Sequence, residues 1–194
     1  GKSSNEIPLQ NFYNFEKLGV IPFDVDLKGL DLTIGSHDPR VQIKANEVLP
    51  VGVFNLSITP PKVIEETHER MHQHFHPSGG EWKRWYMPRT AMVFINSDKK
   101  LKAADQSEKA KAQATNAWEN YWRAMEGTLD SQKVQSAVGN ALVGTPEEIA
   151  EQIQKKYHKD DRLMLWFDFN NHDNESVKNS MKWFMQEVKP LLAH

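Results

Sequence analysis

Residues 89–96 read RTAMVFIN, a nearly continuous apolar run, and a helix-compatible segment follows from Leu101 to Met125. Strands that are covered on both faces show such runs, which are typical of parallel sheets. The same order of apolar run and helix-compatible segment recurs along the chain. The other runs are LDLTIG (30–35), VGVFNLSI (51–58) and RLMLWFDF (162–169). This alternation predicts the α/β class with a parallel sheet, and both an open doubly wound sheet and a barrel agree with it.

A firm helix start precedes the last of these runs. In ALVGTPEEIAEQI (141–153), Thr145 can accept hydrogen bonds from free helix amides, and Glu148 can complete a capping box. The proline between them suits the first helical position, where no N–H is needed. The sequence therefore predicts a helix over 146–157. The preceding stretch, GTLDSQKVQSAVGN (127–140), has no clear period and is predicted to be loose.

The composition excludes several classes of function. The chain has 194 residues, enough for one domain with a sizeable core, and its net charge of −2 comes from interspersed acidic and basic residues. We therefore expect no nucleic-acid partner and no membrane partner. The absence of cysteine excludes disulfides, thiolate metal sites and cysteine nucleophiles. No apolar run approaches the ~20 residues of a membrane helix, and GKSSNEIP at the start lacks a signal-peptide pattern, so a cytoplasmic protein is expected.

The motif HERMH (68–72) matches H-E-x-x-H, in which two helical histidines bind zinc and the glutamate acts as a base. Residues four apart share a helix face, so the spacing of His68 and His72 suits a metal. However, His68 also shares an apolar stripe with Ile64 and Met71, and no third ligand follows at the metzincin spacing. A packed, hydrogen-bonded histidine is the favoured interpretation, and no metal site is predicted.

The motif IGSHDPR (34–40) stands where a strand gives way to a helix. Ser36, His37 and the free amides of the helix start can form an anion site, to which Arg40 adds charge. Only one glycine is present, so neither a dinucleotide-binding nor a P-loop fingerprint exists. The alternative is an N-cap, in which Ser36 or Asp38 satisfies the helix amides. From the residues alone, the N-cap is the favoured interpretation.

Polar residues follow the last apolar run in FDFNNHDN (167–174). In parallel α/β folds, the carboxyl ends of the strands face the ligand. Asp168 and Asn170 alternate with Phe167 and Phe169, so one pair is expected to point inward and the other outward. A turn rich in Asn and Asp needs no ligand, and a plain turn is the favoured interpretation.

The segment from Leu101 to Met125 carries aromatic residues at helical spacing. Stripes of this kind usually face the core, so a core face is expected, and a stacking platform for a ligand is the alternative. The stripe consists of Trp118, Tyr121, Trp122 and Met125.

Taken together, the blocks of this sequence resemble one family, the bacterial luciferase-like flavin-dependent monooxygenases. VGTPEEIAEQI, LMLWFDFN and SMKWFMQEVKPLL resemble the end of a luciferase subunit in content and in order. Residues 89–122 are similar to that family's seventh strand, its following turn and its long aromatic helix. Residues 34–54 resemble its fifth strand, helix and sixth strand. The resemblance covers roughly residues 31–192.

The resemblance implies a TIM barrel, of which this chain holds the second half, strands five to eight with their helices. Residues 1–30 are then an irregular N-terminal segment, and residues 31–194 are the C-terminal half of the barrel. The family uses reduced FMN and dioxygen to oxidise a small organic substrate such as an aldehyde. Some related proteins use a deazaflavin instead.

The resemblance also implies a flavin site. In the family, the end of strand five and the following helix start hold the flavin phosphate. These positions correspond to Gly35 and Ser36, with His37 and Arg40 beside them, and this raises the anion-site interpretation above the N-cap. The catalytic subunits of luciferases have an acidic residue where this chain has Gly35.

A mobile lid precedes the G-T-P turn in the family. It corresponds to residues 127–142, with Lys133 as the candidate contact, and a plain connector is the alternative. The family's first four strands, which supply the catalytic residues, have no counterpart here, so the catalytic residues are unknown. Half a barrel has two open strand edges and an uncovered apolar face, so we expect a homodimer or pairing with a missing N-terminal half. The alternative functions are a non-catalytic flavin-binding luciferase homologue that dimerises and a zinc hydrolase that uses HERMH.

Overall fold

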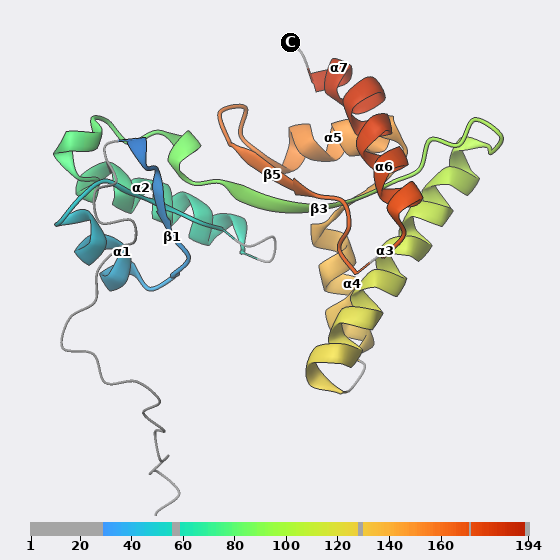
Figure 1. Cartoon of the computed structure of the whole chain (residues 1–194), viewed down its shortest axis with the longest axis horizontal. Coiled ribbons are helices and arrows are strands. Elements are labelled where there is room, and N and C mark those ends of the chain that lie inside the picture. The colour runs from blue at the N-terminus through green and yellow to red at the C-terminus, as the bar shows by residue number, and fades with distance from the viewer. Residues whose placement is uncertain (1–28, 56–58, 128–129, 171, 193–194) are drawn as a thin grey trace, which may run out of the picture. The chain divides into compact units, whose positions relative to one another are not determined.

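In a computed structural model, the protein is described at residues 29–55, 59–127, 130–170 and 172–192 (Figure 1). The chain divides between Asp31 and Leu32 into two units. The first unit, which corresponds to the predicted irregular segment, lies almost entirely outside the described residues. Within the described residues, no helix combines the length and the apolar character that crossing a membrane requires.

A parallel pair of short strands begins the second unit. β1 (Leu32–Ile34) pairs with β2 (Val51–Val53), and α1 (Pro39–Asn46) connects them. α2 (Pro61–His74) follows and packs on β2. A Cβ atom at Gly52 would collide with the backbone oxygen of Tyr86, so glycine is needed where the 3₁₀ turn Arg84–Tyr86 approaches β2. The buried core of this part consists of Val53, Ile64, Met71, Trp82 and Met87.

A second parallel sheet has the strand order β4-β3-β5. β3 (Arg89–Ile95) pairs through its last residues with β4 (Leu142–Gly144) and through its first residues with β5 (Leu163–Trp166). The helices between and after these strands are α3 (Ala103–Glu126), α4 (Ser131–Asn140), α5 (Pro146–Lys156), α6 (Asn174–Trp183) and α7 (Lys189–Leu192). A π-helical turn, Phe184–Val188, joins α6 to α7, and single 3₁₀ turns span Pro77–Gly79 and Arg84–Tyr86.

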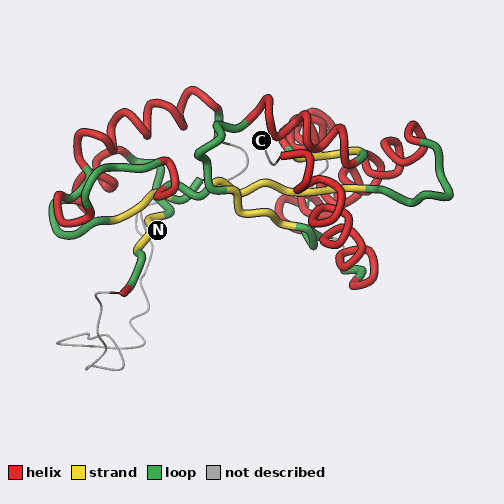
Figure 2. Tube along the Cα trace, turned by 90° about the horizontal axis from the view of Figure 1, so that it is seen from above, coloured by secondary structure: helices red, strands yellow, loops and turns green. Residues whose placement is uncertain are grey.

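Helices cover both faces of β3 (Figures 1 and 2). Ala91, Val93 and Ile95 pack against α5 and the π-helical turn. Met92 and Phe94, which point to the opposite face, pack against α3 and α4. Because helices exclude water from both faces of β3, the residues that point to either face between Ala91 and Ile95 are apolar. This explains the continuous apolar run within RTAMVFIN.

The predicted α/β class with parallel strands is confirmed. The described residues contain no closed barrel, and helices pack on both faces of β3. The finer assignment to strands five to eight of a barrel therefore stays a prediction.

A short bridge connects the two sheets beyond the end of β2. Asn55 donates its N–H to the Pro88 oxygen at 3.1 Å, and its own oxygen accepts the Thr90 N–H at 3.0 Å. The bridge between Asn55 and Arg89 is parallel, like every strand pair in the described residues. The first three residues of VGVFNLSI form β2 as predicted, whereas its last three lie outside the described residues.

The predicted helix start at Thr145 is confirmed. The Thr145 hydroxyl accepts the Glu148 N–H at 3.3 Å, and the Glu148 carboxylate accepts the Thr145 N–H at 2.8 Å, which makes a complete capping box. The preceding Gly144 has φ 140°, where a Cβ atom would meet the Glu148 side chain. The sharp helix start therefore depends on the Gly-Thr-Pro sequence itself.

Replacing Thr145 by alanine is expected to lower the free energy of unfolding by about 1 kcal/mol, because it leaves a buried helix end without its side-chain acceptor. Urea unfolding followed by circular dichroism measures this change. Thr115→Ala is the matched control, because Thr115 is half-buried in the interior of α3, where its hydroxyl donates to the Lys111 oxygen and caps no helix end among the described residues. Equal losses in the two variants would contradict the role of the capping box.

The stretch predicted to be loose contains α4. Asp130 caps this helix by accepting the N–H groups of Gln132 at 2.9 Å and Lys133 at 3.3 Å. Val134 and Ala137 are its buried residues, and both pack in the core formed with α3. Two apolar contacts in ten residues give too weak a period to be recognised in the sequence.

Candidate functional site

The predicted anion site lies at the start of α1. Asp38 is the N-cap, and its carboxylate accepts the Arg40 N–H at 2.9 Å. The Ser36 hydroxyl accepts the Asp38 N–H at 3.2 Å, and the Ser36 oxygen accepts the buried Gln42 side chain at 2.8 Å. His37 is exposed beside them.

Asp38 satisfies the amides of this helix start. Its backbone oxygen accepts the N–H groups of Val41 at 3.1 Å and Gln42 at 3.2 Å. Its carboxylate also binds the Arg40 guanidinium at 2.7 Å, and these hydrogen bonds lower the pKa of Asp38. An anion here would thus contact the Ser36 hydroxyl and a turned Arg40 side chain rather than helix amides. Phosphate binding at Gly35, Ser36, His37 and Arg40 stays a prediction.

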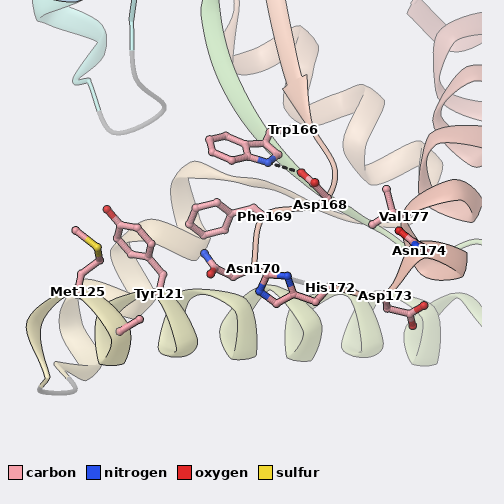
Figure 3. Close-up of a pocket in the computed structure, with 11 residues that line it drawn as sticks. Tyr121, Met125, Trp166, Asp168, Phe169, Asn170, His172, Asp173, Asn174 and Val177 are labelled. Carbon is pink, nitrogen blue, oxygen red and sulfur yellow. Dashed lines mark hydrogen bonds between the residues drawn. The ribbon is translucent and has the colours of Figure 1, made fainter.

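A pocket of about 700 Å³ lies at the carboxyl end of β5 (Figure 3). Trp166 is the last residue of β5, and Asp168 and Phe169 follow it into the pocket wall. Tyr121 and Met125 reach the same pocket from the end of α3. The pocket therefore stands at the strand end where parallel α/β folds bind their ligands.

Alternation along β5 decides which side chains reach the pocket. Leu163, Leu165 and Phe167 are partly buried against the core under α5. Trp166 and Asp168 point to the other face, where Trp166 remains 46% exposed. The Trp166 indole N–H donates a hydrogen bond to the Asp168 carboxylate (Figure 3).

Aromatic contacts hold the pocket wall in place. Phe169 is buried, and its ring lies 4.4 Å from that of Trp118 between centroids. The rings of Tyr121 and Trp166 each lie 5.4 Å from Phe169, and Trp166 meets it edge to face at 85°. Phe169 thus connects the end of β5 to the aromatic stripe of α3.

The turn after Phe169 has unusual backbone angles. Asn170 has φ 46° and His172 has φ 52°, a region that asparagine tolerates better than most residues. Asp173 ends the turn as the N-cap of α6, where its carboxylate accepts the N–H groups of Glu175 at 3.1 Å and Ser176 at 3.2 Å. Asp168, in contrast, caps no helix, so its carboxylate faces the pocket.

The sequence pointed to this strand end but not to the pocket. The polar turn FDFNNHDN was recognised, whereas the contribution of Tyr121 and Met125 depends on a long-range contact with α3. The core face expected for the stripe is confirmed at Trp118, which is buried, but wrong at Met125, which is 67% exposed. None of the residues predicted to hold phosphate lines this pocket in the described part of the chain.

The predicted lid segment packs on α3. The Lys133 ammonium lies 5.1 Å from the centre of the Trp122 ring, so its described contact is with α3. Lys156 donates hydrogen bonds to the Gly139 oxygen at 2.9 Å and the Ala141 oxygen at 3.1 Å, which fixes the end of α4. Lid movement and a ligand contact at Lys133 stay predictions.

The HERMH histidines lie on α2, and His68 is only 4% exposed. The Trp82 indole, which can only donate, gives its N–H to His68 Nδ1 at 3.1 Å. Neutral His68 therefore carries its proton on Nε2. No group of three metal-binding side chains occurs among the described residues. The geometry favours the packed, hydrogen-bonded histidine over a zinc ligand.

Comparison with known proteins gives a likeness of fold. No family model and no curated protein matches the chain. Among solved structures, it is similar to monooxygenase RslO1 from Streptomyces bottropensis, with a TM-score of 0.62 and 18% identity over 84% of this chain and 48% of that one. The likeness lies in the fold alone. The chain spans about half the length of that monooxygenase.

A second similar structure is apo-MsnO8. Its TM-score is 0.49 and its identity is 11%, with 81% of this chain and 50% of that one covered. At this level of similarity the match carries no argument about the site.

Proposed function

We propose that this chain is the C-terminal portion of a luciferase-like, flavin-dependent monooxygenase that uses reduced FMN and dioxygen to oxidise a small organic substrate such as an aldehyde. The observation that carries the proposal is the match of 84% of the chain to about half of a protein described as a monooxygenase. The order of its sequence blocks, which resembles the end of a luciferase subunit, supports it independently.

The exposed apolar residues of the edge strands support an incomplete assembly. Leu32 on β1 is 45% exposed, and Met164 on β5 is 46% exposed. Within the described residues, β1 pairs only with β2 and β5 only with β3. Open edges and exposed apolar residues usually mark a surface that another chain covers. We propose that a missing N-terminal half of the barrel, or a second copy, covers them.

The residues at α1 fit a flavin phosphate in part. The Ser36 hydroxyl and the Arg40 guanidinium would hold it, because the amides of the helix start are already satisfied by Asp38. The Arg40 side chain is 90% exposed, so its ion pair with Asp38 is weak and a phosphate can replace it. Bound reduced FMN would supply the electrons for the reaction with dioxygen; a deazaflavin is the alternative.

The pocket at the end of β5 and the segment 127–142 have proposed roles of their own. The pocket at the end of β5 would hold the organic substrate against the wall formed by Trp166 and Phe169. The segment 127–142 would act as a lid, because Gly127 ends α3 in a left-handed conformation and gives the chain a turning point. Closure of this segment would exclude water from the reaction.

FMN titration under anaerobic reducing conditions tests the phosphate site. Arg40→Ala is expected to weaken binding about tenfold, because a charge-assisted contact to phosphate is lost. Lys44→Ala is the matched control, since Lys44 is an exposed cation on the same helix and pairs with Glu47 at 2.5 Å. Loss of affinity in both variants alike, or no FMN binding, would contradict the proposed site.

Turnover separates the enzyme from the alternative function. A non-catalytic, dimeric flavin-binding homologue would bind FMN as a particle of twice 22.4 kDa and form no oxidised aldehyde product. The proposed monooxygenase forms product once the covering half is present. Exposed apolar side chains on β1 and β5 suit either assembly.

A further inference from the structure

The pocket at the end of β5 has an aromatic wall. Figure 3 shows the side chains of Tyr121, Phe169 and Trp166 along one side of it. Ring contacts of 5.4 Å from Phe169 to each of its two neighbours fix this wall. Aromatic faces attract cations, because the π-electrons make the face of the ring negative.

Three titratable side chains other than tyrosine line the pocket among the described residues: Asp168, His172 and Asp173. No described lining residue is a lysine or an arginine. The Asp168 carboxylate is oriented by the Trp166 indole N–H and stands beside the aromatic wall (Figure 3). Its charge is not compensated by an ion pair among the described residues.

We propose that this pocket binds an organic cation, such as a quaternary ammonium or an alkylamine group. The cation would lie on the Trp166 ring and against the Asp168 carboxylate. An anionic ligand would be repelled by the Asp168 carboxylate, and a bare metal ion lacks a cluster of three ligating side chains in the described part of the chain. That this cation is the substrate rests on the proposed monooxygenase function, whereas the binding site itself does not.

Choline and 3,3-dimethylbutan-1-ol test the inference, because they share one shape and differ in charge. The full chain is titrated with each, and the indole N–H signals of its six tryptophans are followed by NMR. Choline is expected to bind about tenfold more tightly than the neutral alcohol and to shift the Trp166 signal. Equal affinity for the two compounds, or no saturable binding, overturns the proposal.

Variants of the wall locate the site. Trp166→Leu is expected to weaken choline binding about tenfold, and Trp166→Phe to restore part of it, because an aromatic face remains. Asp168→Asn should weaken it about fivefold. Trp85→Leu is the matched control, since Trp85 is 55% exposed, lies outside this pocket and stacks with Arg162. A Trp85→Leu effect as large as that of Trp166→Leu overturns the assignment.

Repeating the choline titration with FMN present distinguishes the two proposals. Choline binding by a chain that does not bind FMN contradicts the proposed function and leaves the cation site intact. FMN binding that is lost in Arg40→Ala, together with equal affinity for choline and the alcohol, overturns the cation site and leaves the proposed function intact. The Trp166 indole N–H signal reports on the pocket in the titrations with and without FMN. Neither titration requires the chain to turn over a substrate.

Discussion

Replacing Asp161 by alanine is expected to lower the free energy of unfolding by about 3 to 5 kcal/mol, because it leaves the largely buried Arg89 guanidinium without its counter-ion and removes one of the two partners of Arg84. The Asp161 side chain is 1% exposed and accepts hydrogen bonds from Arg84 at 2.6 Å and Arg89 at 2.8 Å. It also accepts the His158 N–H at 3.1 Å. Burial raises the pKa of Asp161, but these hydrogen bonds outweigh it and hold the pKa below its usual range.

The two arginines depend on Asp161 to different degrees. Arg84 keeps a second partner, because Glu65 accepts two of its hydrogen bonds at 2.8 and 2.9 Å. Arg89 is 12% exposed, and among the described residues its guanidinium keeps the stacking contact with the Tyr157 ring at 4.4 Å. Most of the loss is therefore expected to come from Arg89, which begins β3.

Urea unfolding at neutral pH measures the Asp161 effect. Asp160→Ala is the matched control, because the side chain of the neighbouring Asp160 is 64% exposed. Its one ion-pair contact among the described residues is with the His158 ring, at 3.7 Å. Its expected loss is within about 0.5 kcal/mol. If the two aspartate variants unfold alike, the buried ion network does not hold the starts of β3 and β5 together.

Local patterns in the sequence predict the parts of this fold that depend on neighbouring residues. The run at 89–96 predicts a strand that is dry on both faces, and β3 is such a strand. The capping box depends on Thr145 and Glu148, which are three residues apart, and α5 begins directly after Thr145 as this pair predicts. Both features are set within a few residues, so no tertiary information is needed to find them.

Features that depend on distant contacts were not predicted. A strand that is apolar on both faces indicates cover on each side, but not whether a helix or the opposite wall of a barrel provides it. The pattern therefore left the doubly wound sheet and the barrel open. α4 was missed for a related reason, because its stability depends on packing Val134 and Ala137 against α3 rather than on a strong period of its own.

The candidate site shows the same division. The alternation expected for this stretch is wrong beyond Asp168: Phe167 packs in the core under α5, whereas Phe169 packs against α3 and lines the pocket together with Asp168. The strand has ended there, so the two-residue period no longer decides which way a side chain points. Asp168 joins Tyr121 in one pocket only because α3 returns past the end of β5. At Ser36, the cap and anion interpretations use the same residue types, so sequence alone does not separate them.

Stability is expected to fall by on the order of 2 kcal/mol as the pH is lowered from about 6.5 to about 4, because folding keeps His68 neutral. Burial, followed by the nearby positive charge of Arg84, lowers the pKa of His68 to about 4. The unfolded chain binds a proton near the ordinary histidine pKa of about 6.5, whereas the folded chain does not. The contribution is thus fully present above pH 6.5 and is lost as the pH falls through the folded pKa.

His68→Asn isolates this contribution from that of the carboxylates. Asparagine has an oxygen near the position of Nδ1, so it can accept the Trp82 N–H, and it does not titrate. The unfolding free energy of this variant is expected to change less between pH 7 and pH 4.5 than that of the parent chain. If the difference in unfolding free energy between the parent chain and His68→Asn stays constant across this range, His68 accepts a proton in the folded state. The Trp82–His68 hydrogen bond would then not keep His68 neutral.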